Sequence, residues 1–445
     1  MTRPLGPRPR TRTRIRADHL VLTALVGGGV LSLSLAVLSA PTPLMLTLAL
    51  AAHVFGLLAG YFVAVMLVLM SRAPLLEREI GADRLARWHG RLGRVFVATM
   101  IVHVVAATAT WIALRHDTII GGALNLMSLP WLWPALAATV LFVAVGALSI
   151  RAARRRLSYE RWHSIHLLTY VAIALSFGHE LAGPNLAGFL PAEVFWSLLY
   201  VYAFALVLRY RVLRPLEQTW RHRLRVETVL SEAPGVVSIV FRGHYVDDLH
   251  AVPGQFFRWR FLTRRTWLSA HPFSLSAPAQ NNRLRITVKD LGSGSRLLHS
   301  ITPGTLVLAE GPYGAMTSRR RTRPDVLLVA GGVGITPMRA LFETLDADSG
   351  AITLLYRAST VDDIVFRDEL EEIAAHRGVE IVWMIGRSSD PANRFSAERL
   401  TQLVPNVRTR EVYLCASPAL SDAARTALLA TGLPRRHLHE EVFSF

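Results

Sequence analysis

The chain has 445 residues, 51% of them hydrophobic, and a formal net charge of +17. Its length allows two or three domains, and so large a hydrophobic share indicates a membrane portion rather than a wholly soluble protein. The basic residues gather between apolar segments instead of forming one patch, which argues against a nucleic-acid-binding protein. The single cysteine, Cys415, excludes both a disulfide framework and a cysteine-ligated metal cluster.

An arginine- and proline-rich arm, residues 1–17, precedes six apolar segments. Each segment is near the length that crosses a bilayer as a helix. The six segments are approximately residues 20–40, 46–70, 89–114, 131–150, 163–181 and 192–210. We therefore expect a transmembrane domain over residues 18–214, surrounded by the lipid bilayer.

The charge of the connecting segments predicts the orientation of these spans. The N-terminal arm, the loops at 71–88 and 151–161 and the exit after residue 208 are rich in arginine. Little positive charge is found in the alternate loops, at residues 39–43, 115–130 and 180–191. Basic loops stay on the cytoplasmic side. The sequence thus predicts a multi-pass protein of the cell membrane, with both termini and everything after the sixth span in the cytoplasm.

The third apolar segment carries two histidines fourteen residues apart, in the stretch WHGRLGRVFVATMIVH from Trp88 to His103. Fourteen residues of helix rise about 21 Å and make roughly four turns, so His89 and His103 share one face near opposite edges of a ~30 Å hydrocarbon layer. Polar side chains inside a membrane indicate function, because hydrocarbon offers them no partner. Two imidazoles stacked in this way could hold two haems, with His89 on the cytoplasmic side.

The fifth segment supplies candidate partners for these histidines. It begins RWHSIHLLTY, with His163 and His166, and ends SFGHE, with His179. We pair His89 with His166 at an inner haem and His103 with His179 at an outer haem, and His163 is the alternative ligand of the inner one. A polar contact at a helix end is the other interpretation of each histidine alone, but four histidines at paired depths favour metal ligation.

The spacing within the fifth segment does not suit a regular helix. Thirteen residues separate His166 from His179, which leaves the second imidazole roughly 140° away from the face of the first. The segment therefore needs a local distortion, and we expect it at Gly178.

After residue 214 the pattern changes from membrane spans to a soluble protein. Between residues 221 and 316, short alternating runs separated by Gly, Pro, Asn and Asp predict an antiparallel β-barrel, which we assign to residues 215–320. From Pro324 onward, strands alternate with helices, which predicts a doubly wound α/β domain over residues 321–445.

Four motifs of this soluble part resemble the ferredoxin–NADP reductase type of flavin and nicotinamide module. They are HPFSLSAP (271–278), KDLGSGS (289–295), EGPYG (310–314) and LLVAGGVGITP (327–337). The resemblance implies FAD in the barrel, with a catalytic hydroxyl at Ser274 near the reactive edge of the flavin, and NADPH or NADH on the glycine-rich turn. Small residues let backbone amides and a helix N-terminus approach a pyrophosphate. The cofactor-binding residues implied are His271, Pro272, Phe273, Ser274, Lys289, Gly292, Ser295, Gly311, Gly314, Gly331, Gly332, Gly334, Thr336 and Pro337.

Two sites nearer the C-terminus complete the resemblance. LCASP resembles the loop that positions nicotinamide through a catalytic cysteine, here Cys415, although Ala416 stands where that family usually has glycine. The ending HEEVFSF resembles a terminal pattern whose aromatic residue stacks on the flavin, a role that falls on Phe443, with Phe445 in reserve. Arg357, after the second strand of the α/β domain, either pairs with a 2′-phosphate and favours NADPH or is an ordinary surface arginine.

Over nearly its whole length the chain resembles the ferric reductase and NADPH oxidase family of membrane flavocytochromes, of bacterial type. The resemblance rests on the HGRLG and IVH elements, on WHSIHLLTY and on the four soluble motifs. It implies a membrane oxidoreductase in which electrons pass from cytosolic NAD(P)H through FAD and two b-type haems to an external small-molecule acceptor. That acceptor is a ferric chelate or dioxygen, which gives superoxide.

Two alternatives remain open at this stage. A partner protein, which the sequence does not identify, could receive the electrons. The membrane half could instead be a haem-binding module without turnover, although an intact nicotinamide site argues against this.

Overall fold

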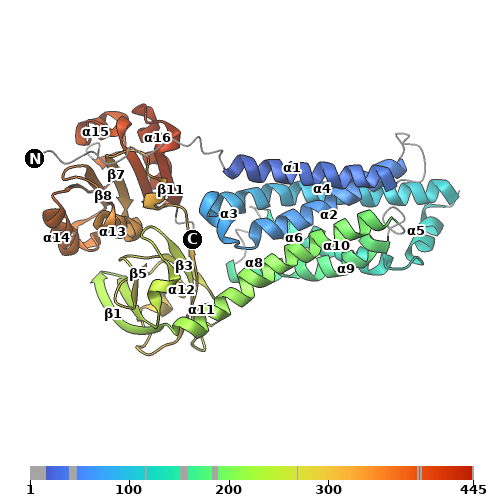
Figure 1. The fold of residues 1–445 in the computed structure, drawn as a ribbon, viewed down its shortest axis with the longest axis horizontal. Coiled ribbons are helices and arrows are strands. Elements are labelled where there is room, and N and C mark those ends of the chain that lie inside the picture. Colours follow the sequence, from blue (N-terminus) through green and yellow to red (C-terminus); the bar gives the residue numbers. More distant parts are fainter. Residues whose placement is uncertain are drawn as a thin grey trace, which may run out of the picture. The chain divides into compact units, whose positions relative to one another are not determined.

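The computed structural model describes residues 17–39, 48–115, 118–150, 159–182, 189–267, 269–387, 390 and 393–442. The chain divides into two compact units, one ending at Arg211 and the other beginning at Val212. The first unit is helical and the second contains the sheets (Figure 1). Each unit is described by itself.

The long helices of the helical unit are apolar and follow the order that the hydropathy predicted. Its helices are α1 (Ala17–Ser39), α2 (Leu48–Met70), α3 (Pro74–Glu79), α4 (Ala82–Arg115), α5 (Ile119–Met127), α6 (Leu132–Ser149), α8 (Tyr159–His166), α9 (Leu168–Ala182), α10 (Leu190–Val207) and the π-helical turn η1 (Leu208–Leu213). Within the described residues, five helical runs are long and apolar enough to cross a membrane: Leu48–Met70, Arg84–Arg115, Leu132–Ser149, Arg161–Ala182 and Leu190–His222. These helices support a membrane protein.

Small side chains allow the helices of this unit to pack closely. Ala64 of α2, Ala172 of α9 and Ala192 and Ala203 of α10 are completely buried. Close packing of small residues, rather than a hydrophobic effect, holds helices together in lipid. Tyrosines add hydrogen bonds between helices: the Tyr61 hydroxyl donates to the Leu25 carbonyl at 2.6 Å, and the Tyr200 hydroxyl donates to the Gly60 carbonyl at 3.0 Å.

The fifth predicted span is interrupted at Leu167, between the end of α8 and the start of α9. There the Tyr170 N–H donates to the Leu167 carbonyl at 3.0 Å, a three-residue step in place of the usual four. A distortion was expected in this span, but the prediction of Gly178 as its place was wrong, because Gly178 lies within the uninterrupted α9.

The second unit begins with α11 (Arg214–His222) and an antiparallel β-structure. Its elements are β1 (Arg225–Ala233), β2 (Val236–Arg242), β3 (Phe256–Phe261), β4 (His271–Ser274), β5 (Arg283–Lys289), α12 (Ser293–Leu298) and β6 (Val307–Tyr313). The strands pair in two three-stranded sheets, β1-β2-β5 and β4-β3-β6. Isolated bridges join the sheets at Arg225–Leu306 and Leu275–Ile286. We call this half of the unit the barrel lobe, although its described strands pair as two sheets and not as one continuous ladder.

Aromatic side chains fill the space between these two sheets. Alternate residues of β3, namely Phe257, Trp259 and Phe261, point inward and are completely buried, as a period of two requires. The rings of Phe241 and Trp259 stack with their centres 4.4 Å apart.

The rest of the second unit, which we call the nucleotide lobe, is built on a parallel sheet in the order β11-β10-β7-β8-β9. The strands are β7 (Val326–Gly331), β8 (Ile352–Ala358), β9 (Glu380–Ile385), β10 (Glu411–Ala416) and β11 (Leu438–Val442). Two separate cores cover its faces, one formed with α13 (Ile335–Thr344) and α14 (Arg367–Arg377), the other with α15 (Ala397–Leu403) and α16 (Pro418–Ala430). This is the doubly wound α/β arrangement that the alternation of elements predicted.

A buried carboxylate ties the edge strand β11 to the sheet. Glu411, at the start of β10, is completely buried and accepts hydrogen bonds from the N–H and hydroxyl of Thr322 at 3.0 and 2.8 Å. Its other oxygen lies 2.6 Å from Nε2 of His439, on β11. Burial by itself raises the pKa of Glu411, but the hydrogen bonds from His439 and Thr322 outweigh burial and lower the pKa to about 2.

We predict that Glu411→Gln destabilises the second unit by about 2–4 kcal/mol, because it leaves the buried donors unmatched. The pKa of a free glutamate is about 4.3, so the ionised Glu411 stabilises the fold above that pH and loses its contribution as the pH falls toward 2. Thermal unfolding of the full-length protein at a series of pH values measures both effects. The variant should lack this acid-dependent component, whereas Glu372→Gln, at an exposed position of α14, should retain it. An unchanged acid response in Glu411→Gln would contradict the assignment.

Candidate functional site

The histidine pair expected at the inner haem consists of His89, on α4, and His166, at the end of α8. Their ring centres are 6.0 Å apart and their planes are inclined by 74°. The Nδ1 atoms of both rings are buried without a hydrogen-bond partner among the described residues. Trp162, one turn before His166, stacks on its ring with the centres 5.1 Å apart, which limits rotation of the imidazole.

The pair expected at the outer haem consists of His103, on α4, and His179, on α9. Their ring centres are 6.3 Å apart, with an inclination of 53°. The Nδ1 atom of His103 lies 2.7 Å from the Ala52 carbonyl oxygen on α2. Because a carbonyl can only accept, Nδ1 carries the proton and Nε2 keeps its lone pair, which is the usual way in which a second contact orients a metal-binding imidazole.

Both separations fit a haem held between two imidazoles. A metal–nitrogen bond of about 2 Å on each side would put the centres of two opposed imidazole rings on the order of 6 Å apart. Within the part of the chain that is described, no group of three or more His, Cys, Asp or Glu side chains could hold a metal ion. A porphyrin would supply four further ligands to a metal held between two histidines. Haem ligation by these four residues stays a prediction.

Helix α2 carries a stripe of small residues that the sequence analysis did not identify. Ala52, Gly56 and Gly60 follow one another at intervals of four. A Cβ atom on Gly56 would lie 2.7 Å from Nδ1 of His103, and one on Gly60 would lie 2.1 Å from Oε1 of Glu180. The stripe makes room for two polar side chains inside the helical unit, and the repeated small-xxx-small spacing was the signal that could have shown it.

Gly178 has a packing role instead of the expected role in bending α9. A Cβ atom there would lie 2.5 Å from the indole of Trp131. Trp131 precedes α6 with a φ of 67°, a backbone conformation that bulky residues rarely adopt. The indole thus lies directly beside the residue that precedes His179.

The flavin motif HPFSLSAP contributes strand β4 and lies in the barrel lobe. Ser274 pairs with Phe256 of β3, and its Oγ is buried without a partner among the described residues. A buried hydroxyl that lacks a protein partner fits a group that would hydrogen-bond to a cofactor. Phe273 packs at the edge of the barrel core, and Pro272, opposite Arg258, is exposed.

The second motif lies against the first. A Cβ atom on Gly294 would be 2.9 Å from the His271 ring, whereas nothing approaches within 4 Å of the corresponding position at Gly292. The Ser295 hydroxyl accepts from the Leu291 N–H at 2.8 Å and donates to the Gly292 carbonyl at 3.1 Å, which closes the turn. The open position at Gly292 leaves room for an approaching ligand.

Lys289 and the EGPYG turn have contacts within the protein. The Lys289 ammonium lies 3.9 Å from a carboxylate oxygen of Asp363, in the nucleotide lobe. In the turn, Gly311 packs on the Phe257 ring, and Gly314 has a φ of 98° that a side chain would strain. These contacts show how the residues are held, and their roles toward FAD stay predictions.

The glycine-rich turn joins β7 to α13 through the short helix η4 (Gly332–Gly334). Gly334 packs so tightly that a Cβ atom would lie 2.0 Å from the Cys415 carbonyl oxygen. Gly332, with a φ of 54°, has no atom within 4 Å of such a position, so the turn is open where a phosphate would approach. Thr336 closes the turn by donating to the Val333 carbonyl at 2.9 Å, and the next residue, Pro337, is buried in the first turn of α13.

Cys415 and Ala416 end β10 beside the glycine-rich turn. Cys415 is completely buried and pairs with Ala330 of β7. The Ala416 methyl lies 2.9 Å from where a Cβ atom on Gly331 would be, so the methyl group fills space beside the glycine. Strand β11 ends with Val442 paired to Ala416. The predicted aromatic residues Phe443 and Phe445 lie outside the described residues.

Arg357 lies within the sheet and is only 4% exposed, so the interpretation as an ordinary surface arginine was wrong. Its Nη1 atom donates to the carbonyls of Ala358 and Met384. Burial lowers the pKa of its guanidinium, although the charge of Asp390 opposes this. Binding of a 2′-phosphate by Arg357 stays a prediction.

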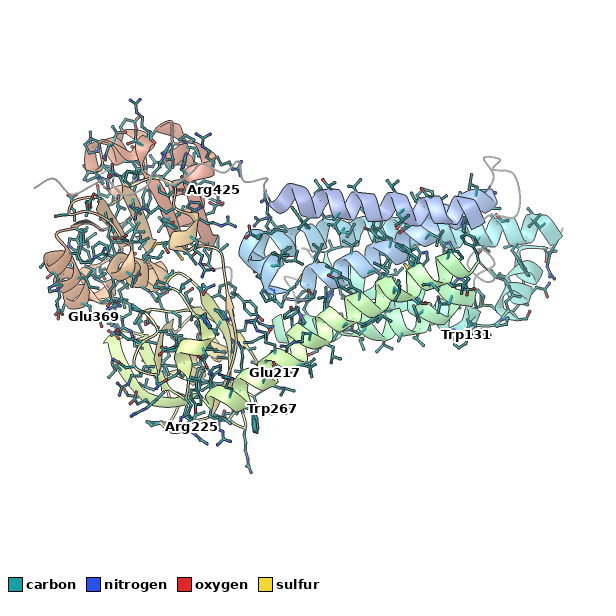
Figure 2. The ribbon with its side chains drawn as sticks, in the orientation of Figure 1. Trp131, Glu217, Arg225, Trp267, Glu369 and Arg425 are labelled. Atoms are coloured by element: carbon teal, nitrogen blue, oxygen red, sulfur yellow. The ribbon has the colours of Figure 1, made fainter. Side chains whose placement is uncertain are left out.

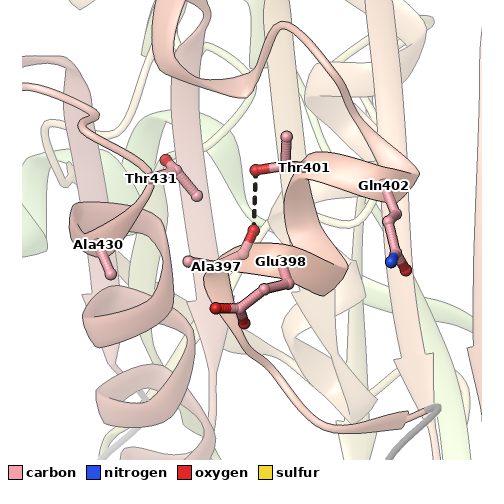
Figure 3. Close-up of a pocket in the computed structure, with 6 residues that line it drawn as sticks. All are labelled: Ala397, Glu398, Thr401, Gln402, Ala430 and Thr431. Atoms are coloured by element: carbon pink, nitrogen blue, oxygen red, sulfur yellow. Dashed lines mark hydrogen bonds between the residues drawn. The ribbon is translucent and has the colours of Figure 1, made fainter.

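A shallow groove of about 480 Å³ lies between α15 and α16, on the outer side of the nucleotide lobe (Figure 3). It is lined by Ala397, Glu398, Thr401, Gln402, Ala430 and Thr431. It contains none of the residues that the motifs assign to a cofactor.

Two family models match the chain. A ferric reductase like transmembrane component matches residues 55–177, and an oxidoreductase NAD-binding domain matches residues 328–426. The first range contains His89, His103 and His166 and ends two residues before His179, and the second contains the glycine-rich turn.

Curated relatives resemble the second unit. The ferredoxin reductase component of 3-ketosteroid-9-alpha-monooxygenase from Mycolicibacterium smegmatis is 31% identical, and the match covers 49% of this chain and 65% of that protein. Ferredoxin–NADP reductase B from Sorangium cellulosum is 31% identical over 37% of this chain and 74% of its own length. The chain therefore spans slightly less than two thirds of the first of these relatives.

Solved structures of reductase domains also resemble about half of this chain, at lower sequence identity. The flavohem-like FAD/NAD-binding domain of nitric oxide dioxygenase from Vibrio cholerae is 24% identical, with a TM-score of 0.41, over 50% of this chain and 98% of that one. A ferredoxin NADP+ reductase from Neisseria gonorrhoeae with bound FAD and NADP is 17% identical, with a TM-score of 0.43, over the same shares.

The chain thus joins apolar helices, which support a membrane protein, to an oxidoreductase module. The module is of the FAD- and NAD(P)H-binding, ferredoxin–NADP reductase type. Through this module the chain belongs to the ferredoxin–NADP reductase family, and the module is joined to a ferric reductase-like transmembrane component at residues 55–177.

We predict that Gly334→Ala weakens NAD(P)H binding, because the new methyl would collide with the Cys415 carbonyl and displace the turn. The KM for NADPH in flavin reduction should rise about tenfold or more, while the flavin content stays unchanged. Stopped-flow flavin reduction at several NADPH concentrations measures this, and reduction by dithionite is the control that bypasses the nucleotide. A KM equal to that of the wild type would contradict the assigned place of the pyrophosphate.

Proposed function

We propose that this protein transfers electrons from cytosolic NADPH or NADH, through FAD and two bis-histidine b-type haems, to an acceptor on the other side of the membrane. The observation that carries the proposal is the pairing of His89 with His166 and of His103 with His179 in a chain that also contains a reductase module. An electron that enters at the haem of one histidine pair would pass next to the haem of the second pair, within the same helical unit.

The residues of the second unit bind and orient the two nucleotides in this proposal. The β4 strand holds the flavin ring system with the Ser274 hydroxyl, and the Gly292 turn leaves room for the flavin pyrophosphate. The open Gly332 turn and the N-terminus of α13 bind the pyrophosphate of NAD(P)H. When bound, FAD supplies the conversion of a two-electron hydride into single electrons. In this proposal Cys415 positions the nicotinamide, and the role of stacking on the flavin falls on Phe443, which lies outside the described residues.

The helical unit holds the haems through its four histidines. When bound, each haem would supply a one-electron carrier, and ligation by two histidines would leave its iron no open position. The Ala52 carbonyl orients His103, and the Trp162 ring restrains His166. Because both iron positions are filled, the acceptor would be reduced at the porphyrin edge and not as a ligand.

The topology belongs to the same proposal. Helix α1 is the sixth span beside the five long apolar runs, and both termini lie in the cytoplasm with the reductase module. The inner pair, His89 and His166, then faces the source of electrons, and His103 and His179 face the acceptor. That acceptor is a ferric chelate or dioxygen, and reduction of dioxygen gives superoxide.

A second candidate keeps the redox chemistry but passes the electrons to a partner protein. It is favoured by the curated relatives, several of which are named as reductase components or reductase subunits of monooxygenases. Those proteins serve a second component, and this chain could do the same from the membrane.

Anaerobic stopped-flow reduction of the purified protein by NADPH tests the function. The proposal expects flavin reduction followed by reduction of two haems, and prompt haem reoxidation when a ferric chelate or oxygen is admitted. Reduced haems that neither acceptor reoxidises would favour a partner protein. Haems that NADPH does not reduce would overturn electron transfer altogether.

We predict that His103→Ala removes one of two haems while NADPH still reduces the flavin at the wild-type rate. Haem content by pyridine haemochrome absorbance, set against flavin content, measures the loss. His163→Ala is the matched control on the other helix and should retain both haems. Two haems in His103→Ala, or a haem lost in His163→Ala, would contradict the ligand assignment.

A further inference from the structure

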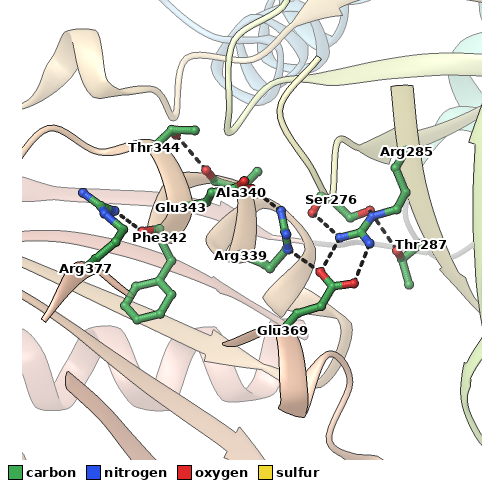
Figure 4. A network of polar contacts seen from close by, with 10 residues as sticks. All are labelled: Ser276, Arg285, Thr287, Arg339, Ala340, Phe342, Glu343, Thr344, Glu369 and Arg377. Carbon is green, nitrogen blue, oxygen red and sulfur yellow. Dashed lines mark hydrogen bonds and ion pairs between the residues drawn. The ribbon is translucent and has the colours of Figure 1, made fainter. Parts of the chain in front are cut away.

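One carboxylate in the second unit is shared by two arginines from different lobes. Glu369, on α14, accepts both arms of the Arg285 guanidinium, at 2.7 and 2.9 Å, and also the Nε–H of Arg339 at 2.7 Å. Arg285 is on β5 of the barrel lobe, and Arg339 is on α13 of the nucleotide lobe. Figure 2 labels Glu369 among the side chains of the whole structure, and Figure 4 shows it between the two guanidinium groups.

On the barrel side, this network reaches the residues that directly follow β4 (His271–Ser274), which we call the flavin strand. The Arg285 guanidinium donates from Nε to the Ser276 hydroxyl at 3.2 Å and from Nη2 to the Ser276 carbonyl at 3.1 Å. The Ser276 hydroxyl also accepts from Thr287 at 2.9 Å. Ser276 is two residues beyond Ser274, so Arg285 holds the backbone that carries the hydroxyl assigned to the flavin.

On the nucleotide side, the network reaches the helix that binds the pyrophosphate. Helix α13 begins at Ile335, directly after the glycine-rich turn, and Arg339 is in its second turn. Arg339 also pairs with Glu343 of the same helix. Glu369 therefore connects the flavin strand to the start of α13 through one side chain from each lobe.

The burial of these side chains makes the shared carboxylate necessary. The Arg285 and Arg339 side chains are 14% and 10% exposed, so water solvates their charges poorly. Burial raises the pKa of Glu369, but the hydrogen bonds and charges of Arg285 and Arg339 outweigh burial and hold it below its usual range. Without the negative charge of Glu369, the poorly solvated Arg285 would lose its carboxylate partner in the nucleotide lobe, and Arg339 would keep only Glu343.

Another ion pair between the lobes is weaker. Lys289 and Asp363 lie 3.9 Å apart, and their side chains are 36% and 39% exposed, so solvent screens their attraction. Arg285 and Glu369 form a bidentate pair, which fixes orientation as well as distance. The Arg285 guanidinium also lies over the Phe366 ring, 4.8 Å from its centre, which restrains it further.

We propose that Glu369 is a positioning residue for hydride transfer, which sets the distance between the flavin strand and the nicotinamide nucleotide by joining Arg285 to Arg339. The proposal rests on the proposed use of NAD(P)H and FAD by this module. In that reaction the dihydronicotinamide loses a hydride and the flavin gains it. Glu369 touches neither group and acts through the two arginines.

Glu369→Gln in the full-length, FAD-loaded protein tests this. Glutamine has nearly the same shape, but its amide is neutral and directs N–H groups at the guanidinium groups. We expect the flavin-reduction rate constant at saturating NADPH to fall about 10- to 100-fold, since small displacements of reacting groups have effects of this size. The long-wavelength charge-transfer absorbance of nicotinamide stacked on flavin should fall with it. Flavin content and the unfolding temperature should change little by comparison.

Two further variants keep the test decisive. Glu371→Gln, on the same helix, removes an exposed ion pair with Arg367 that does not join the lobes, and it should match the wild type. Arg285→Lys keeps the charge but cannot make the bidentate contact, and it should lower the same rate constant and absorbance even if Glu369→Gln fails to fold. Wild-type rates in Arg285→Lys, or in a folded Glu369→Gln, would overturn the proposal.

Failure of this inference is distinguishable from failure of the proposed function. If NADPH and NADH do not reduce the flavin of the wild-type protein, the function itself is wrong. If the wild type is reduced and the variants are reduced equally fast, only the positioning role of Glu369 is wrong.

Discussion

Hydrocarbon gives a polar side chain nothing to hydrogen-bond to, and this constraint organises the helical unit. Several polar groups inside it therefore hydrogen-bond to the backbone of a neighbouring helix. The Tyr61 and Tyr200 hydroxyls donate to carbonyls of neighbouring helices, and the His103 ring donates to Ala52. Such contacts need close approach of backbones, which the small residues of α2 allow. The same packing that satisfies the polar groups thus brings the histidines into pairs.

The second unit depends on a different constraint, the directionality of a parallel sheet. Parallel strands end at one edge, so the glycine-rich turn after β7 meets Cys415 and Ala416 at the end of β10. The contact is so close that Gly334 has no room for a side chain. Arg285 and Arg339 meet at Glu369 and link this edge to the residues that follow β4, and we propose that this link sets the distance between the two nucleotides.

Several parts of the site were predictable from local patterns. The fourteen-residue spacing predicted that His89 and His103 share one face of α4, because fourteen residues make roughly four whole turns of a straight helix. Helix α8–α9 departs from this rule at Leu167, and the position of its distortion was not predictable from the glycine at 178. The sequence left Arg357 as either a 2′-phosphate ligand or a surface arginine, since nothing local indicates that it lies buried against the neighbouring strand β9.

The sequence by itself determined the kinds of element, their order, the membrane portion and the flavin and nicotinamide motifs, because periodicity and turn chemistry involve residues close together in the chain. Only the tertiary structure decided which side chains meet. Ala52 and His103 are 51 residues apart, and Arg285 and Glu369 are 84 residues apart. Contacts at such separations depend on how whole helices and lobes pack, and no local pattern encodes that packing.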